Sequence, residues 1–158
     1  MLATTIICFE CFVVGAIIIG PARKNTFSKE FMEQFKEEHQ KAFPGTDPAI
    51  MGHPDAGDGR YSDKLEYKQW VDFNNRWRVH QNFVEFLPLM VTTLVIGGLF
   101  VPVVTMVVAI INALARIIYT IMYATKGSDN RVLAALTGNI PIYLLLVWTL
   151  VKVIILAI

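Results

Sequence analysis

The stretch FLPLMVTTLVIGGLFVPVVTMVVAIINALARIIYTIMYAT, residues 86–125, decides the fold. Arg116 is its only charged residue, so the stretch is too apolar for the surface of a water-soluble domain. One helix of this length would measure about 60 Å at 1.5 Å per residue, twice the ~30 Å hydrocarbon core of a bilayer. Two glycines and a proline interrupt the run at Gly97–Pro102. The stretch therefore predicts two membrane-spanning helices joined by a tight turn.

Two more apolar runs lie near the ends of the chain. The first, Leu2 to Ile19, contains one charge, at Glu10, and the last, Val132 to Val151, contains none. A cleaved signal peptide is the rival interpretation of the first run, but a basic start is missing and Glu10 lies in its centre. We therefore expect one all-α membrane domain over 1–158, a bundle of four helices at about 2–20, 78–98, 102–125 and 132–156, with a long polar segment at 21–77.

The composition supports a membrane protein and excludes several other classes. Apolar residues make up 54% of the 158, charged residues only 17%, and the mean hydropathy is +0.50; an ordinary soluble domain has about 25% charged residues. A net charge of +1 provides no basic surface for nucleic acid. Residues 21–79 hold ten Lys/Arg and ten Asp/Glu, and the other 99 residues hold four and three. The positive-inside rule then predicts that the polar segment and the 126–131 loop are cytosolic and both termini lie on the other side.

The polar segment shows a helical pattern of its own. Phe27, Phe31 and Phe35 recur every four residues between charged ones, which predicts an amphipathic helix of three to four turns. Packing on the protein's own helices is favoured over binding to the membrane surface, which remains the alternative. Ser62 is positioned to cap a helix that runs on into the second span.

Neither metal nor redox chemistry is indicated. His53, Asp55 and Asp58 lie in an irregular loop, and their spacing matches neither a calcium loop nor a zinc site. Cys8 and Cys11 lie in an apolar run without a redox or zinc framework around them, so we expect both to be small buried hydrophobes.

Ionisable and polar residues inside the predicted spans are the candidate functional groups, because such groups are costly at membrane depth. Arg78, Asn82 and Glu85 share one helix face by their spacing of four and three. A second set shares one face of the third predicted span and consists of Arg116, Tyr119 and Tyr123. Asn112 extends this face by one turn. Glu85 is about 10 Å inward from Arg78, and Arg116 is about 15 Å inward from Lys126.

These depths predict that the two sets meet in the cytosolic half of the membrane. A pocket with two guanidinium groups, a carboxylate, an amide and two phenols suits a small zwitterionic ligand with several carboxylates, because arginine binds carboxylates by a bidentate fork. The alternative is purely structural: Arg116 is neutralised by Glu85 or Glu10, and Asn82 bridges helices. In either case we expect an obligate oligomer. Burying Arg116 at a contact between subunits, paired with Glu85 or, as the second choice, Glu10, avoids the cost of exposing it to lipid.

The run R-V-H-Q-N-F-V-E-F-L-P at 78–88 closely resembles the second-helix signature R-x-x-x-N-x-x-E-x-x-P of the MAPEG family, membrane-associated proteins in eicosanoid and glutathione metabolism. Arg116-Ile-Ile-Tyr119 and Tyr123 are similar to the arginine and aromatic partners of the family's third helix. Asn130-Arg131 resembles the arginine that opens its fourth helix. Four spans with a cytosolic first loop also match.

The resemblance implies a homotrimeric four-helix bundle that binds glutathione between neighbouring protomers. The implied glutathione-binding residues are Arg78, Asn82, Glu85, Arg116, Tyr119 and Tyr123, and the implied thiol-activating residue is Arg131. It implies a glutathione transferase for hydrophobic electrophiles, with glutathione as co-substrate, no metal, and a peroxidase activity as an option. The long first loop, and Phe86 where leukotriene synthases have a tyrosine, point to a general microsomal enzyme.

Two other functions compete with this one. A non-catalytic MAPEG-like subunit of a larger membrane assembly would use the polar segment for docking. A channel or carrier ranks last, because the chain has no internal repeat. The endoplasmic reticulum is the family's default membrane, and a mitochondrial membrane is the alternative.

Overall fold

The computed structural model describes residues 2–158. The first long helix consists of α1 (Leu2–Val14), the π-helical segment η1 (Gly15–Ile19) and α2 (Gly20–Thr26). The other three are α5 (Tyr67–Phe100), α6 (Pro102–Lys126) and α7 (Val132–Ala157). All four are long and apolar enough to span a membrane, and residues 2–158 contain no strand. The predicted all-α, four-span membrane fold is therefore confirmed.

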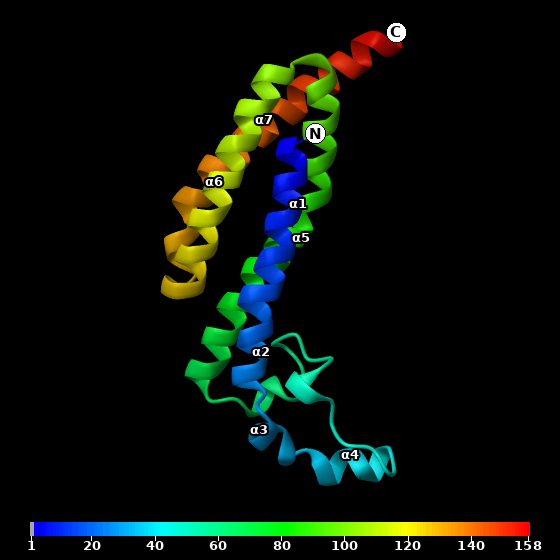
Figure 1. Ribbon diagram of the computed structural model, residues 1–158, viewed down its shortest axis with the longest axis vertical. Coiled ribbons are helices and arrows are strands. Elements are labelled where there is room, and N and C mark those ends of the chain that lie inside the picture. Colours follow the sequence, from blue (N-terminus) through cyan, green and yellow to red (C-terminus); the bar gives the residue numbers. More distant parts are fainter. Residues whose placement is uncertain (1) are drawn as a thin grey trace.

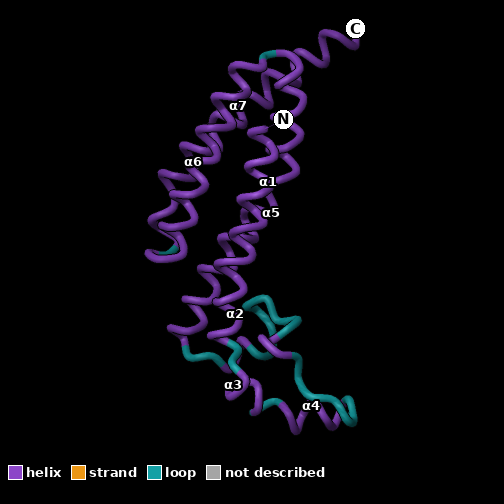
Figure 2. Tube along the Cα trace, viewed as in Figure 1, coloured by secondary structure: helices purple, strands orange, loops and turns teal. Residues whose placement is uncertain are grey.

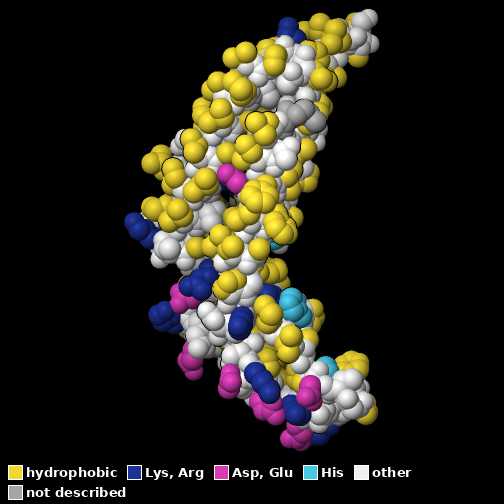
Figure 3. Space-filling model, in the orientation of Figure 1, with side chains coloured by type: hydrophobic (Ala, Val, Ile, Leu, Met, Phe, Trp, Pro, Cys, Tyr) yellow, Lys and Arg dark blue, Asp and Glu magenta, His cyan; other side chains and the backbone are white. Residues whose placement is uncertain are grey.

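The helices form an elongated bundle with a polar attachment at one end. α6 and α7 run side by side as a hairpin, and α1 lies along α5 (Figure 1). Both termini lie at the end of the bundle opposite the polar segment (Figure 1). Apolar side chains cover the visible face of the bundle, and charged ones gather on the polar segment (Figure 3). This separation is what a bundle surrounded by lipid with one aqueous end requires.

The helix boundaries differ from the predicted ones at the polar end. α5 begins at Tyr67 instead of 78, because the helical backbone continues through polar residues outside the apolar span. The first helix likewise continues to Thr26. Between α5 and α6 only Val101 is non-helical, so both glycines of the expected turn remain in the helix.

The π-helical segment has a local cause. Pro21 has no N–H and its ring crowds the carbonyl one turn earlier, so a regular α-helix is disrupted there. The chain responds with an extra residue in the turn, in which the Gly20 N–H bonds to the Gly15 carbonyl. Gly15 also lets α5 approach closely, since a Cβ at this position would lie 2.9 Å from His80 Nε2.

Small residues bring α6 and α7 together. A Cβ on Gly138 would lie 3.0 Å from the Ala115 Cβ, so a larger residue at this crossing would push the two helices a few tenths of an ångström apart. At the same place Asn112 Nδ2 donates to the Gly138 carbonyl oxygen at 3.0 Å. Close packing plus an interhelical hydrogen bond is how helices associate in lipid, where no hydrophobic effect drives them together.

The polar module, residues 27–66, is folded. It contains the short helices α3 (Lys29–Glu33), α4 (Lys36–Ala42), η2 (Ile50–Gly52) and η3 (Ser62–Lys64), joined by most of the loops in the chain (Figure 2). The expected single amphipathic helix is therefore wrong, because α3 and α4 are separate. Its apolar face nevertheless packs on the chain itself: the Phe27 ring lies 5.0 Å from Phe73, and Phe35 lies 4.7 Å from Tyr61.

Arg23 anchors the polar module to the bundle. Its side chain is only 3% exposed, and its Cζ lies 5.6 Å, 5.9 Å and 5.6 Å from the ring centres of Phe27, Phe73 and Trp77. Arg23 Nε donates to the Met51 carbonyl oxygen at 3.1 Å. Met51 has a φ of 60°, a strained conformation for a non-glycine residue, and this hydrogen bond helps to hold it. One guanidinium thus joins α2, α5 and η2.

Asp55 organises the loop of the module. Its carboxylate accepts hydrogen bonds from the Ser62 hydroxyl at 2.6 Å and from the amides of Gly57, Gly59 and Ser62 at 2.7, 3.2 and 2.8 Å. Burial alone would raise the pKa of this carboxyl, but the hydrogen bonds together hold the pKa below its usual value.

Two expectations about single residues are wrong. Ser62 does not cap a helix, because its hydroxyl donates to Asp55 and α5 begins only after Glu66. Cys8, expected to be buried, is exposed.

We predict that Arg23→Met loosens the polar module without unfolding the bundle. The change leaves the Met51 carbonyl without its charged donor, a loss of about 1.5–3 kcal/mol. Amide hydrogen exchange at residues 50–62 should accelerate by about ten- to a hundredfold, while exchange in the spans stays constant. Lys24→Met, which changes the exposed neighbour, is the control. Unchanged exchange in Arg23→Met would show that the module is held by other contacts.

Candidate functional site

α6 carries a buried polar face. Asn112, Arg116, Tyr119 and Tyr123 are 0%, 4%, 3% and 5% exposed, and their spacing of three to four residues aligns them along the helix. The opposite side of α6 is apolar and exposed, as lipid contact requires. The helix therefore presents its polar groups to α5 and α7.

Arg116 is held by its own chain. Its Nη2 donates to Asn139 Oδ1 at 3.3 Å and lies 3.9 Å from Met90 Sδ. Within residues 2–158 no carboxylate lies at ion-pair distance from Arg116. The expected ion pair with Glu85 or Glu10 is thus not formed within one chain. Contacts with α5 and α7 of the same chain already bury Arg116, so its burial does not need a second subunit. The rings of Phe83, Phe86 and Tyr119 also lie against the guanidinium, with their centres 5.1, 5.4 and 5.6 Å from Cζ.

Two arginines flank a pair of tyrosines. The Tyr119 and Tyr123 rings meet edge to face with centres 5.6 Å apart. Arg116 lies against Tyr119, and Arg131, at the end of η4 (Ser128–Arg131), lies over Tyr123 with Cζ 4.5 Å from the ring centre. Such cation–π contacts fix the planes of the guanidinium groups. We call these four residues the Arg–Tyr ladder. It runs from the middle of the bundle to its polar end.

Some polar groups at the ladder remain available for further hydrogen bonds. Tyr119 Oη is fully buried and makes no well-formed hydrogen bond among residues 2–158, although the Arg131 guanidinium lies close enough to interact with it. Asn112 Oδ1, just beyond the ladder on α6, is also buried without a partner in these residues. Arg131 is only partly buried, so its guanidinium remains accessible at the polar end. Because guanidinium groups only donate, an accessible one favours anionic groups such as a carboxylate or a thiolate.

The other predicted set, on α5, does not face the Arg–Tyr ladder. On α5, Arg78 and Glu85 are exposed and Asn82 is half-buried. The cause is helical periodicity: Val79, Phe83 and Met90 occupy the inward face of α5, so the polar set is turned outward. Glu85 accepts a hydrogen bond from Gln81 Nε2 at 3.3 Å. A single chain therefore does not bring the α5 set together with the ladder, contrary to the expectation that the two sets meet.

Sequence reasoning missed one member of the site. Asn139 is a hydrogen-bond partner of Arg116, yet it is not among the residues that the sequence analysis predicts for the site. The signal was present, since Asn139 is an amide inside an otherwise apolar helix, and such residues usually bond across helices.

The comparisons with known proteins agree with this architecture. The MAPEG family model matches residues 2–151, which include the first three spans, most of the fourth and every residue of the ladder. Neither the curated proteins nor the solved structures contain a match to the chain. With nearly the whole chain matched, the protein belongs to the MAPEG family.

Proposed function

We propose that the protein is a membrane-bound glutathione transferase that conjugates glutathione to hydrophobic electrophiles. Membership of MAPEG, a family that includes glutathione transferases, supports this activity. The observation that carries the proposal is the accessible Arg131 guanidinium at the polar end of the Arg–Tyr ladder. A soluble peptide reaches this end from water, while an apolar electrophile arrives through the lipid.

The outward polar set of α5 supplies the peptide-binding groups. The Arg78 guanidinium suits a carboxylate of glutathione, Asn82 its amide backbone, and Glu85 its ammonium group. In one chain this set faces away from the ladder, so a complete site requires a neighbouring copy. We therefore propose a homotrimer, with glutathione bound between α5 of one protomer and the ladder of the next.

Arg131 is proposed to activate the thiol. A free thiol has a pKa near 8.5, and only the thiolate is strongly nucleophilic. A guanidinium next to the sulfur stabilises the thiolate, so the proton is released to water without a general base. The sulfur then attacks the electrophilic carbon, a C–S bond forms, and the leaving group departs. With a lipid hydroperoxide the thiolate attacks oxygen instead, and a second glutathione completes a disulfide as the alcohol and water are released.

The proposed location is a membrane with cytosolic access to glutathione. The endoplasmic reticulum membrane is our first choice and a mitochondrial membrane the second. In both, the polar module and Arg131 face the glutathione-containing compartment.

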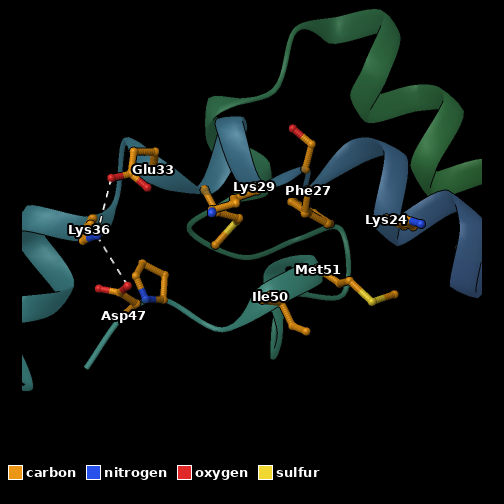
Figure 4. A pocket seen from close by; sticks show the side chains of 11 residues that line it. Lys24, Phe27, Lys29, Glu33, Lys36, Asp47, Ile50 and Met51 are labelled. Carbon is orange, nitrogen blue, oxygen red and sulfur yellow. Dashed lines mark ion pairs between the residues drawn. The ribbon is translucent and has the colours of Figure 1, made fainter. Parts of the chain in front are cut away.

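A second candidate function rests on the polar module. Between α2, α3 and η2 the module holds a pocket of about 370 Å³ with a mostly apolar lining (Figure 4). At its edge Lys36 pairs with Glu33 at 3.6 Å and with Asp47 at 3.4 Å, and Ile50 is 79% exposed. The apolar pocket, more than the single exposed side chain at its edge, is the kind of surface that binds another protein. This observation supports a role as a subunit of a larger membrane assembly.

We predict that Arg131→Ala loses most of the transfer activity but preserves most of the affinity for glutathione. Loss of one charge-stabilising donor typically lowers kcat by 10²–10³-fold. The ultraviolet absorbance of bound thiolate at neutral pH should disappear, and Arg131→Lys, which keeps a positive charge, should retain part of it. A protein that only has a structural role would bind no glutathione in any form. Persistence of the thiolate signal in Arg131→Ala would remove Arg131 from the mechanism.

Arg78→Ala should weaken glutathione binding itself. Losing one charge-assisted hydrogen bond costs about 1.5–3 kcal/mol, which raises Kd by about ten- to a hundredfold. Isothermal titration of glutathione measures the change. Arg76→Ala, two residues earlier on the same helix, is the matched control and should bind normally. Equal affinity in Arg78→Ala and the parent protein would exclude Arg78 from the site.

The oligomeric state provides a separate test. Glu85 is exposed on the apolar part of α5, and leaving a charged side chain toward lipid costs at least about 2.5–3.5 kcal/mol. Covering this face with a neighbouring copy avoids the cost. Native mass spectrometry in mild detergent should therefore detect trimers, and a protein that remains monomeric yet binds glutathione would contradict the shared site.

A further inference from the structure

The pocket between α2, α3 and η2 is separate from the proposed glutathione site. Its volume of about 370 Å³ lies within the usual range for small-molecule sites. Phe27, Met32 and Met51 belong to its apolar lining. Lys24 lies at one end of the pocket and Lys36 at the other (Figure 4). None of the lining residues belongs to the Arg–Tyr ladder or to the polar set of α5, so the pocket is free to bind a molecule of its own.

The depth of the pocket determines from which side a ligand arrives. Lys24 lies five residues beyond Ile19, the last residue of the apolar run, so it is about 8 Å farther out along the helix axis. The headgroup layer is about 5–8 Å thick on each side of the hydrocarbon core. Lys24 is therefore at the outer edge of this layer, and α3, which continues away from the bundle, lies in water (Figure 1). A ligand reaches the pocket from the aqueous phase rather than through the lipid.

The charges around the pocket favour an anion. The lining contains three lysines and two acidic residues, which leaves a net charge of +1. Both acidic residues, Glu33 and Asp47, are already paired with Lys36. Lys24 and Lys29 form no ion pair within residues 2–158. A ligand with one negative charge would balance this lining.

The apolar part of the lining favours an aromatic ligand. Met32 and Met51 contribute thioether side chains, which make favourable contacts with the edges of rings. The Phe27 ring can pack against another ring, offset or edge to face. Phe27 and Met32 are packed into the aromatic core of the polar module, so this wall is in place before a ligand binds. Ile50, exposed at the edge, loses contact with water when the pocket is filled.

We propose that this pocket binds a water-borne organic anion with an aromatic body and a single negative charge. The ammonium groups of Lys24 and Lys29 attract the anionic group, and the rings lie against the apolar lining. A neutral aromatic molecule lacks the charge, and an aliphatic anion lacks the ring contacts. The pocket shares no residue with the proposed glutathione site, so this inference does not rest on the transferase activity.

Three matched compounds test the proposal. They are a naphthalene sulfonate, the neutral naphthalene sulfonamide with the same skeleton, and an aliphatic sulfonate of similar volume. The full-length protein is placed in nanodiscs of a neutral phospholipid, and isothermal titration measures each affinity against empty nanodiscs. We expect the aromatic sulfonate to bind about three- to fivefold more tightly than either of the others, the usual effect of one exposed ion pair or one sulfur–ring contact. Added salt should reduce its advantage over the sulfonamide.

Variants of the polar module locate the binding. Lys24→Gln/Lys29→Gln should bind the aromatic sulfonate and the sulfonamide equally. Lys41→Gln/Lys64→Gln removes the same charge from exposed lysines outside the pocket and should keep the preference. Ile50→Glu, at an exposed position on the edge, should weaken binding of all three compounds. Saturating glutathione should not displace the sulfonate, because the two sites are separate.

Four results would overturn the proposal. The first is equal binding of the aromatic sulfonate and the sulfonamide, or a preference that survives in Lys24→Gln/Lys29→Gln. The second is equal binding of the aromatic and the aliphatic sulfonate. The third is displacement of the sulfonate by glutathione, which would place it in the glutathione site. The last is the absence of any binding, which would leave the pocket to the protein contact of the second candidate function.

Discussion

The burial of the Arg116 guanidinium in the membrane-spanning bundle is the constraint on which the arrangement of α5, α6 and α7 depends. A charged group at this depth must be satisfied by protein, and here an amide of α7, a sulfur of α5 and three aromatic rings surround it. These contacts fix the rotation of α6 and therefore align its two tyrosines. The outward direction of the polar set on α5 follows from the same packing, since the residues around Arg116 occupy the inner face.

The four spans were predictable because apolar length is a strong signal. Their shared faces were predictable too, since Arg116, Tyr119 and Tyr123 follow helical spacing whatever surrounds them. Rotation about the helix axis was not predictable: depth alone suggested that Glu85 meets Arg116, while burial of Val79 and Phe83 turns Glu85 away. The polar module was the least predictable part, because its order depends on Arg23 and Asp55, whose contacts link residues far apart in the chain.

The candidate site has two kinds of support. The ladder is complete in one chain and shows which groups are oriented together. The α5 set is exposed, so its role depends on a neighbouring copy, and a single chain carries the residues of both halves without joining them. Under the proposed function, this division lets a bundle with little interior space take a peptide between two copies instead of inside one.

Because α5 is one continuous helix, the polar module and the start of the second span are rigidly connected. As one helix of 34 residues it is about 51 Å long. Phe73 and Trp77, whose rings lie against Arg23, are only a few residues from Arg78 on this helix. No hinge separates these positions, because the backbone is helical throughout. Any force that rotates the polar module about the α5 axis therefore turns the Arg78 face by the same angle. A partner bound to the polar module would therefore also turn the face of α5 that the proposed function assigns to glutathione.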